Sequence, residues 1–297
     1  MWFKNLLVYR VGETRLKKDD LAEKLKDNAL QPCGSFEMLS RGWMAPREED
    51  EYVYNLERQW LILQGVNQKL LPGTVISQVA RERADKLAQK QEHPVGRKQL
   101  REIRERVIEE LMPKALTRRS TLRGWLDTVN GWFVLDTAAA KKADEFVEAL
   151  VSADADLGLK RLDTAQSPAL AMTNWLSTGH APANFTIDQD LELKASGEQQ
   201  ATVRYVNHPL DGREIRDHIA SGKTATRLGL TWKNKVSFLL TEQLQIKRVN
   251  FVDVLQEDSE AGAEDADEQF AIEFSLMTGE LSAMLTDLSE ALGGIKT

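Results

Sequence analysis

The sequence predicts an α+β fold with mostly antiparallel sheets and an inserted helical hairpin. Residues 2–11 alternate well enough between apolar and polar side chains to predict a β-strand, whose side-chain period is two. Val129-Asn130-Gly131-Trp132 places Asn-Gly between apolar strands and favours a two-residue type I′ hairpin turn. Within residues 74–112, two helical apolar patterns are separated by a turn at His93-Pro94-Val95-Gly96 and interrupt the β segments.

The N-terminal half is expected to alternate between β segments and helices. Thr74 is the expected N-cap of the first hairpin helix, and Pro113 ends the second. Asp136 or Thr137 is expected to cap the helix that ends this half. In order, the predicted elements are a strand at 2–11, a helix at 16–30, a loop at 31–43, a hairpin at 60–71 with its turn near Gly65 and Asn67, the helical hairpin, the Asn-Gly hairpin at 125–132, and a helix to residue 150.

A polar connector at 152–168 is the predicted boundary between an N-terminal half, 1–168, and a C-terminal half, 169–297. The last helix has apolar residues at helical spacing and stops at Gly293-Gly294. Before that helix we expect a helix near 170–176, strands near 185–193 and 201–206, a helix near 213–220, two or three strands within 224–254, and an acidic loop at 258–268.

The composition is that of an ordinary soluble globular protein, with 42% apolar and 29% charged residues among 297. No segment approaches the ~20 apolar residues of a membrane span, and the first ten residues are typical of a strand rather than a signal peptide. The single cysteine, Cys33, excludes an internal disulfide and suits a reducing cytoplasm. With four scattered histidines, the chain offers no zinc-type ligand set, so we expect no metal and no cofactor.

The net charge of −7 hides an uneven distribution of charge. Residues 1–150 carry 26 Lys and Arg against 23 Asp and Glu, whereas residues 151–297 carry 13 against 23. Thirteen bases and seven acids lie within residues 81–123, and six bases and one acid within 223–248. Residues 253–290 hold twelve acids and no base. We therefore expect a polarised molecule whose basic regions attract polyanions despite the acidic total.

Two segments resemble enzymatic motifs but lack the required context. Ser221–Thr224 matches the end of a phosphate-binding loop, yet Asp217 occupies the position of the required glycine, and a helix precedes rather than follows. Asp211, Glu214 and Arg216 resemble a nuclease carboxylate cluster, but that cluster needs a lysine on a strand. No Gly-x-Ser-x-Gly elbow is present. The sequence therefore predicts a protein that is not an enzyme.

The strand after Gly222 carries basic residues suited to a phosphate backbone. Its alternation is expected to place Lys223 and Arg227 on one face, with small residues between them, and Lys235 on the same side of the next strand. Exposed strand faces also carry Lys and Arg for solubility, so this pattern alone leaves the DNA interpretation open. The same role is expected of three further arginines at the junction of the helical and Asn-Gly hairpins: Arg118, Arg119 and Arg123.

Two other candidate features are better explained by folding. In the helix at 97–111, Arg101 and Glu105 are spaced i,i+4, which is typical of a solvated, salt-bridged helix. Trp125 and Trp132 flank the Asn-Gly turn, and antiparallel packing already uses such side chains. We expect both tryptophans in the core or an interface rather than on a base-stacking platform.

Several blocks of residues, spread in order over nearly the whole chain, resemble the bacterial recombination-associated RdgC family. None of these blocks lies in the connectors 45–58, 152–168 and 255–268. The blocks are WFKNLLVYR at 2–10, PCGS at 32–35, GW at 42–43, LMPKALTR at 111–118, WLDTVNG at 125–131, AAKKAD at 139–144, SGKTATRLGLTW at 221–232 and LMTGELSAML at 276–285.

The resemblance implies a non-enzymatic, nucleoid-associated protein of the cytoplasm that binds DNA with little sequence preference. Members of the family form a ring-shaped homodimer whose central hole is lined by basic side chains and admits duplex DNA. They restrain the RecA recombinase by occupying DNA that its filament would use. On this chain, Lys223 and Arg227 fall on the family's basic strand, and Arg118 follows its Pro-basic-Ala-aromatic block.

The resemblance also implies subunit contacts. Leu116 stands where the family has a phenylalanine implicated in closing the ring, so that contact is smaller and aliphatic here. Asn207 and His208 correspond to a finger near the other contact. Two points stay open: how DNA enters the ring, and whether single-stranded DNA binds as well as duplex. The alternative function is a protein-interaction module that regulates a recombination protein directly through its acidic C-terminal half.

Overall fold

The structure is a computed structural model that describes residues 1–12, 17–47, 51–153, 155, 157–196, 201–252 and 265–296. The strands are β1 (Leu6–Arg10), β2 (Leu39–Met44), β3 (Tyr54–Leu56), β4 (Gln59–Lys69), β5 (Thr117–Asp127), β6 (Trp132–Asp136), β7 (Lys160–Arg161), β8 (Phe185–Ala195), β9 (Thr202–Tyr205), β10 (Lys223–Trp232), β11 (Val236–Thr241) and β12 (Ile246–Phe251). The helices are α1 (Lys18–Asp27), α2 (Gly73–Gln91), α3 (Arg97–Leu111), the 3-10 turn η1 (Met112–Lys114), α4 (Ala140–Ser152), α5 (Pro168–Thr178), α6 (Arg213–Ala220) and α8 (Ala266–Ala291).

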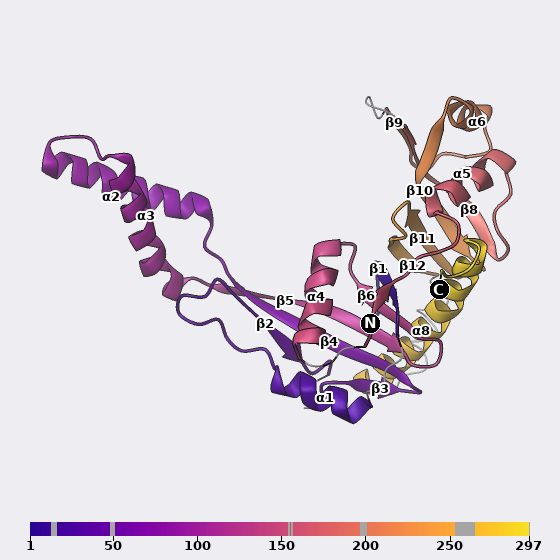
Figure 1. Ribbon diagram of the computed structural model, residues 1–297, viewed down its shortest axis with the longest axis horizontal. Coiled ribbons are helices and arrows are strands. Elements are labelled where there is room, and N and C mark those ends of the chain that lie inside the picture. The colour runs from indigo at the N-terminus through magenta and orange to yellow at the C-terminus, as the bar shows by residue number, and fades with distance from the viewer. Residues whose placement is uncertain are drawn as a thin grey trace.

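One sheet runs through both halves of the chain. Its order is β2-β4-β5-β6-β1-β12-β11-β10-β8-β9, with β3 beside β4 and β7 beside β1. These strand pairs are antiparallel, so the predicted α+β class with antiparallel sheets is confirmed. Figure 1 shows the elements arranged as an open arch, with the α2–α3 hairpin at one end and β9 and α6 at the other.

The sheet has two faces with separate cores, as β1 demonstrates. Leu6 and Val8 pack in a core that includes residues of α5 and α8, whereas Leu7 and Tyr9 pack in a core with α1 and α4. We call the face under α5, α6 and α8 the outer face, and the opposite face the inner face. Because both faces of β1 are covered, residues 6–9 form a continuous apolar run, and the alternation predicted for residues 2–11 is wrong although the strand is present.

The inner face is not covered along its whole length. Leu191 on β8, Leu228 on β10 and Leu240 on β11 point into the outer core. The inner core contains no described residue of these three strands. Within the part of the chain that the structure describes, the C-terminal portion of the sheet therefore exposes its inner face to the hollow of the arch (Figure 1).

The helical hairpin is inserted between β4 and β5, as predicted. It has a small core of its own, made by Ile76, Ala80 and Val107. Charged pairs on its surface include Arg101 with Glu105, which lie 3.0 Å apart and confirm the expected i,i+4 contact. The hairpin therefore stands away from the two main cores (Figure 1).

Two predicted turns are wrong. The segment 60–71 is not a hairpin, because β4 is one strand and the turn lies before it at Glu57 and Arg58, both at positive φ. The Asn-Gly turn is a four-residue loop in which Gly131 has a φ of 67° but Asn130 is not in the left-handed region. The Asp127 carboxylate accepts backbone N–H groups inside this loop and stabilises the longer turn.

Two predicted helix starts are also displaced. Helix α2 begins at Gly73 with Pro72 as its N-cap, two residues before the start that a Thr74 cap requires. Helix α4 has Ala139 as its N-cap, and the Thr137 hydroxyl oxygen, two residues earlier, accepts the Ala139 N–H. Neither Asp136 nor Thr137 is therefore the N-cap of α4.

Helix α8 is the expected last helix, and it ends before two glycines at positive φ. The predicted acidic loop lies mostly outside the described residues, which resume at Asp265, the N-cap of α8. None of the described helices combines the length and the apolarity needed to cross a membrane.

Candidate nucleic-acid interface

A β-bulge in β10 separates Lys223 from Arg227. Ala225 pairs with Leu193 and Arg227 pairs with Glu192. The pairing thus advances by two residues on β10 but by one on β8, which makes Thr226 the extra residue of the bulge. Ala225 before the bulge and Leu228 after it both lie in the outer core. The alternation therefore changes phase, and the prediction that Lys223 and Arg227 share one face is wrong.

Lys223 and Lys235 lie on the outer side of the sheet. The Lys223 Nζ atom is 3.1 Å from the His218 Nδ1 atom on α6. The Lys235 Nζ atom is 2.6 Å from the Glu280 Oε1 atom on α8. The prediction that Lys235 shares the side of Arg227 is therefore wrong as well.

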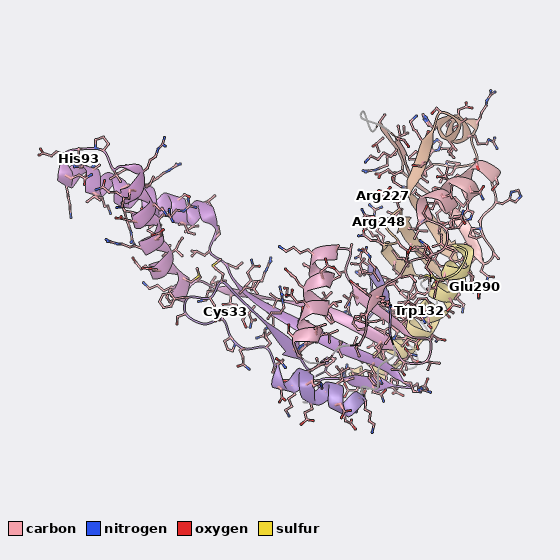
Figure 2. All side chains as sticks on the ribbon, viewed as in Figure 1. Cys33, His93, Trp132, Arg227, Arg248 and Glu290 are labelled. Carbon is pink, nitrogen blue, oxygen red and sulfur yellow. The ribbon has the colours of Figure 1, made fainter. Side chains whose placement is uncertain are left out.

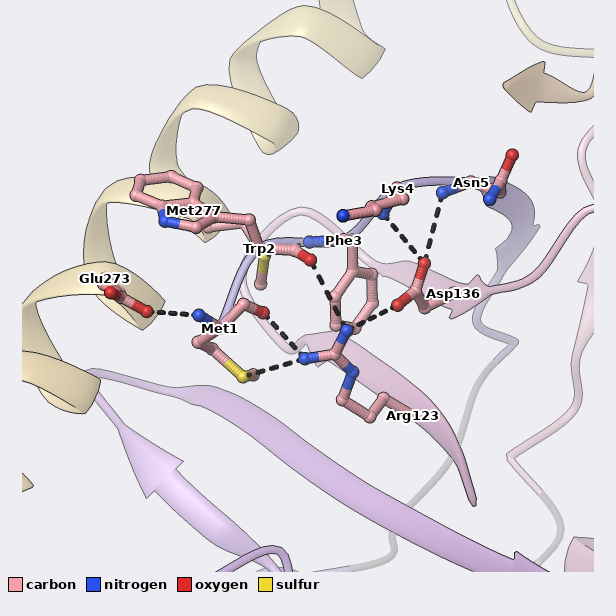
Figure 3. A network of polar contacts seen from close by, with 9 residues as sticks. All are labelled: Met1, Trp2, Phe3, Lys4, Asn5, Arg123, Asp136, Glu273 and Met277. Carbon is pink, nitrogen blue, oxygen red and sulfur yellow. Dashed lines mark hydrogen bonds and ion pairs between the residues drawn. The ribbon is translucent and has the colours of Figure 1, made fainter. Parts of the chain in front are cut away.

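Arg123 holds the N-terminus on the outer face of β5 (Figure 3). Its guanidinium pairs with Asp136 at 2.7 Å and donates to the Met1 carbonyl at 2.8 Å. It also lies 5.1 Å from the centre of the Phe3 ring. The Met1 amino group in turn pairs with Glu273 on α8. These contacts give Arg123 a role in folding, because they join the chain's first residues to β6 and α8.

The other two arginines of β5 lie on opposite faces. Arg119 donates to the Asn67 side chain at 3.0 Å. Both residues have odd numbers in β5 and β4, and the odd-numbered side chains of these strands point to the outer face. Arg118 is exposed and points to the same face of β5 as Leu122 and Leu126, because residues an even number of positions apart share a face of a strand. These two leucines pack with the inner core. Among the six predicted DNA-binding residues, Arg118 and Arg227 are thus the two that lie on the inner face.

Three arginines gather on the uncovered part of the inner face. Arg227 Nε lies 3.5 Å from Glu192, Arg204 Nε donates to the same carboxylate at 3.0 Å, and Arg248 pairs with Asp190 at 3.3 Å. Figure 2 shows Arg227 and Arg248 on the side of the hollow, whereas Glu290 of α8 lies on the opposite side. We call Arg204, Arg227 and Arg248 the inner arginines.

Sequence reasoning did not identify Arg204 and Arg248. Arg204 sits opposite Glu192 on a four-residue strand, so its position depends on strand pairing. Arg248 has a φ of 53° at an irregularity in the β11–β12 pairing, and alternation does not predict where such a side chain points. The only available signal was the excess of bases within residues 223–248.

A shallow groove crosses the inner face beside the inner arginines. It is bordered by Asp188, Thr231, Ser237 and Leu239, and by Gly229, where a Cβ atom would come within 3.2 Å of Asp188. Burial raises the pKa of Asp188 and the charge of Asp190 adds to this effect, while a hydrogen bond from Thr231 opposes it. The groove is therefore lined largely by polar side chains, and the Asp188 side chain fills the space beside Gly229.

Glu192 stays ionised in this setting. Burial by itself raises its pKa, but hydrogen bonds from Arg204 and Thr226 and the nearby Arg227 charge together lower the pKa below its ordinary value. The Arg204 and Arg227 side chains remain 60% and 42% exposed, whereas that of Glu192 is 11% exposed. The carboxylate is thus fixed in the sheet, and the guanidinium groups reach into solvent.

An apolar patch lies at the other end of the arch. Leu116 is 78% exposed and Phe36 is 71% exposed. The Leu70 N–H donates to the Leu116 carbonyl. The buried Lys69 ammonium donates to the Gly34 and Ser35 carbonyls at 2.7 Å each, and these bonds hold the loop before β2 against β4. The patch consists of Phe36, Met38, Leu39, Leu70 and Leu116.

Asn207 and His208 follow β9 and lie next to the groove. The Asn207 N–H donates to Asp190 at 3.2 Å, and the His208 N–H donates to the Gln189 carbonyl at 3.1 Å. Both residues are exposed, at the end of β9 away from the β8–β9 turn. Residues 197–200 of that turn lie outside the described residues, and a subunit contact by Asn207 and His208 stays a prediction.

No group of three or more His, Cys, Asp and Glu side chains within the described ranges is arranged to hold a metal ion. Trp125 and Trp132 are 0% and 2% exposed, which confirms that they are core residues.

Comparison with known proteins identifies the family of the chain. A family model described as "Putative exonuclease, RdgC" matches residues 1–295. The chain belongs to the RdgC family. RdgC relatives named recombination-associated protein RdgC include that of Janthinobacterium sp. (strain Marseille), 49% identical over 99% of this chain and 98% of that one. The relatives of Dechloromonas aromatica (strain RCB) and Bordetella pertussis are 50% and 48% identical, over 99% and 100% of this chain and 98% and 99% of theirs.

The names of these RdgC relatives describe an association with recombination and name no enzymatic activity. The description of the family model does name one, an exonuclease. The match extends across both halves of the chain and includes the inner arginines and the apolar patch. The resemblance inferred from the sequence blocks is thus confirmed at the level of the family.

Proposed function

We propose that this RdgC-family chain is a non-enzymatic, nucleoid-associated protein that binds DNA without sequence preference. It acts as a ring-shaped homodimer that encloses duplex DNA, and it restrains RecA-dependent recombination by occupying the DNA. The observation that carries the proposal is the placement of the inner arginines on an uncovered sheet face toward the hollow of the arch (Figure 2).

The distribution of charge supports a polyanion on the inner side. Binding without sequence preference requires phosphate neutralisation and no reading of base edges. Arginine suits this role, because its planar guanidinium forms paired hydrogen bonds to phosphate oxygens. Helix α8 on the outer face carries six acids and no base, and this charge repels DNA from the outside.

The apolar patch supports assembly. Exposed apolar side chains that gather at one site are typical of protein–protein contacts. In a twofold dimer, the two arches would face each other, and each inner arginine would be present twice. Three inner arginines and Arg118 per subunit would then give up to eight phosphate contacts, within the range that makes affinity fall steeply with salt.

The test is a salt titration of binding to a fluorescent duplex of random sequence. We expect the Arg227→Glu, Arg248→Glu double variant to lose at least about tenfold in affinity and part of the salt slope, because inner-face phosphate contacts are removed. The Lys223→Glu, Lys235→Glu variant changes net charge equally on the outer side. We expect it to bind within about threefold of the wild type, because exposed charges beyond a Debye length are screened.

Equal losses in both double variants would contradict an inner-face site. Unchanged binding in the first variant would do the same. If the wild type bound no duplex at any salt concentration, the result would favour the alternative function, a protein-interaction module. Against that alternative, three acids of α8 are already bonded within the chain: Glu273 to Met1, Glu280 to Lys235, and Asp287 to Lys233.

A further inference from the structure

Strand β8 places carboxylates where the proposed site needs positive charge. Asp188, Asp190 and Glu192 occupy alternate positions of the strand, and all three lie on the inner face. Asp190 and Glu192 contact the three inner arginines, while Asp188 accepts a hydrogen bond from Thr231. A surface meant only to hold DNA as tightly as possible would not contain these acids.

We propose that Glu192 and Asp190 are counter-charges built into the DNA-binding face, which occupy arginine donors that phosphate oxygens would otherwise take and so keep DNA binding weak and exchangeable. This inference rests on the proposed function, because it assumes that DNA lies on the inner face. It assigns to the two acids a role in setting affinity.

The geometry makes Glu192 a fixed competitor. One of its oxygens accepts from both Nε and Nη2 of Arg204, and the other accepts from Thr226 at 3.0 Å and lies 3.5 Å from Arg227 Nε. Its side chain is 11% exposed, so it has little freedom to turn away. The arginines are the mobile partners, because they have long side chains and much greater exposure.

Two opposing effects decide whether the carboxylates strengthen or weaken DNA binding. The carboxylates order the arginines, which helps binding, but they also lower the positive potential that a phosphate meets. Ordering is the weaker effect, because exposed ion pairs hold their side chains only loosely and Arg248 remains 74% exposed. A full negative charge in contact with the binding donors acts on every phosphate that approaches. Removal of the charge should therefore tighten binding.

The arrangement also favours movement of DNA. When a phosphate leaves, Arg204 and Arg227 return to Glu192 and are not left without a partner, so the released state is stabilised. Exchange of one phosphate for the next along a duplex then requires no unpaired guanidinium. A ring of this kind would hold DNA topologically while its contacts exchange rapidly.

The test compares Glu192→Gln and Asp190→Asn in the full-length chain, with binding to the random-sequence duplex measured across a salt series. Glutamine and asparagine keep a hydrogen-bond acceptor but remove the charge. We expect Glu192→Gln to bind about three- to tenfold more tightly at low salt and to show a steeper salt slope. Asp190→Asn should also bind DNA more tightly than the wild type, but by a smaller factor, because its partner Arg248 is more exposed. The matched control is Glu290→Gln, which removes one charge from the outer face and should bind as the wild type does (Figure 2).

Tighter binding by Glu192→Gln with no change in Glu290→Gln supports the proposal. Binding that is equal to or weaker than wild type, in a variant that melts at the wild-type temperature, overturns it and makes Glu192 a positioning residue. If Glu192→Gln does not fold, Asp190→Asn decides by the same criteria. If no protein in the series binds DNA, the proposed function fails together with this inference, and that outcome is distinct from binding without a difference.

Discussion

At the scale of single residues, the arginines predicted to bind DNA divide between a role in folding and the proposed role in binding. Arg123 is bonded to the first residues of the chain and to Asp136, whereas Arg227 reaches from the sheet into the hollow. Sequence composition treats the two arginines alike. The contacts of each side chain separate them, and each role leads to a different measurable loss.

Arg123→Ala should destabilise the fold by about 2 kcal/mol, because it leaves the mostly buried Asp136 carboxylate and two backbone carbonyls without their charged partner. The measurement is urea denaturation followed by tryptophan fluorescence. Arg118→Ala, on the same strand but exposed, should stay within about 0.5 kcal/mol of the wild type. A loss of DNA binding without a loss of stability in Arg123→Ala would contradict its assignment to folding.

Asp127 predicts a pH dependence of stability. Burial acts to raise its pKa, but hydrogen bonds from Asn130, Val129 and Ser282 outweigh burial and leave the pKa below its ordinary value. Because the folded-state pKa is lower than the unfolded one, ionised Asp127 stabilises the fold above about pH 4, and this stability is lost as the pH falls further.

The measurement is the free energy of unfolding of the wild type and of Asp127→Asn from neutral to acid pH. The variant should be less stable at pH 7 by about 1–3 kcal/mol, and the difference should shrink as the pH falls below about 4. A difference that stays constant over this range would show that Asp127 contributes no charge-dependent stability.

At the scale of elements, the sequence predicts what depends on local pattern and misses what depends on pairing. The period of helical apolar residues gave α3 and α8, and Pro113 marked the end of α3 correctly. The bulge at Thr226 was not predictable, because an unbroken alternation reads the same with or without an extra residue. For the same reason, the sequence could not show that Lys223 and Arg227 lie on opposite faces of the sheet.

Gly42 illustrates a second constraint set by pairing. A Cβ atom at this position of β2 would lie 2.5 Å from the Leu30 Cα atom and 2.6 Å from the Leu30 nitrogen. Both are backbone atoms, and the Leu30 N–H donates to the Trp43 carbonyl at 2.8 Å. The loop after α1 can therefore pack on β2 only if residue 42 has no side chain.

Gly42→Ala should cost about 2 kcal/mol or more, because the backbone of residues 29–30 must move and lose its bonds to β2. Gly73→Ala is the matched control, since nothing lies within 4 Å of its Cβ position and alanine is favoured in the first turn of α2. Thermal unfolding of the two variants gives the comparison. Equal melting temperatures would show that the loop does not depend on this close approach.

At the scale of the whole molecule, the arch and its charge separation could be predicted only in outline. The excess of bases within residues 223–248 and of acids within 253–290 indicated two surfaces. The curvature that turns one surface inward arises from a sheet of twelve strands and from helices packed unevenly on its two faces. No local pattern contains that information, whereas the resemblance of whole blocks to a family does.

Assembly predicts the effect of a charge in the apolar patch. Leu116→Asp should weaken self-association by at least about tenfold, because a carboxylate would be buried at the subunit contact without a partner. Leu170→Asp is the control, since Leu170 is 60% exposed at the start of α5 and outside the patch. Sedimentation velocity over a concentration series distinguishes them. Equal association of the two variants and the wild type would contradict a subunit contact at Leu116.

The most direct test of the central claim, that DNA runs along the inner face, is photo-cross-linking from defined positions. A photoreactive amino acid at Ser237 would stand on the inner face beside the groove. The same group at Glu290 would stand on the outer side of α8 (Figure 2). We predict cross-links to duplex DNA from position 237 and none from position 290, with both variants binding DNA as the wild type does. Cross-links from position 290 alone, or from neither position under conditions of full binding, would contradict the claim.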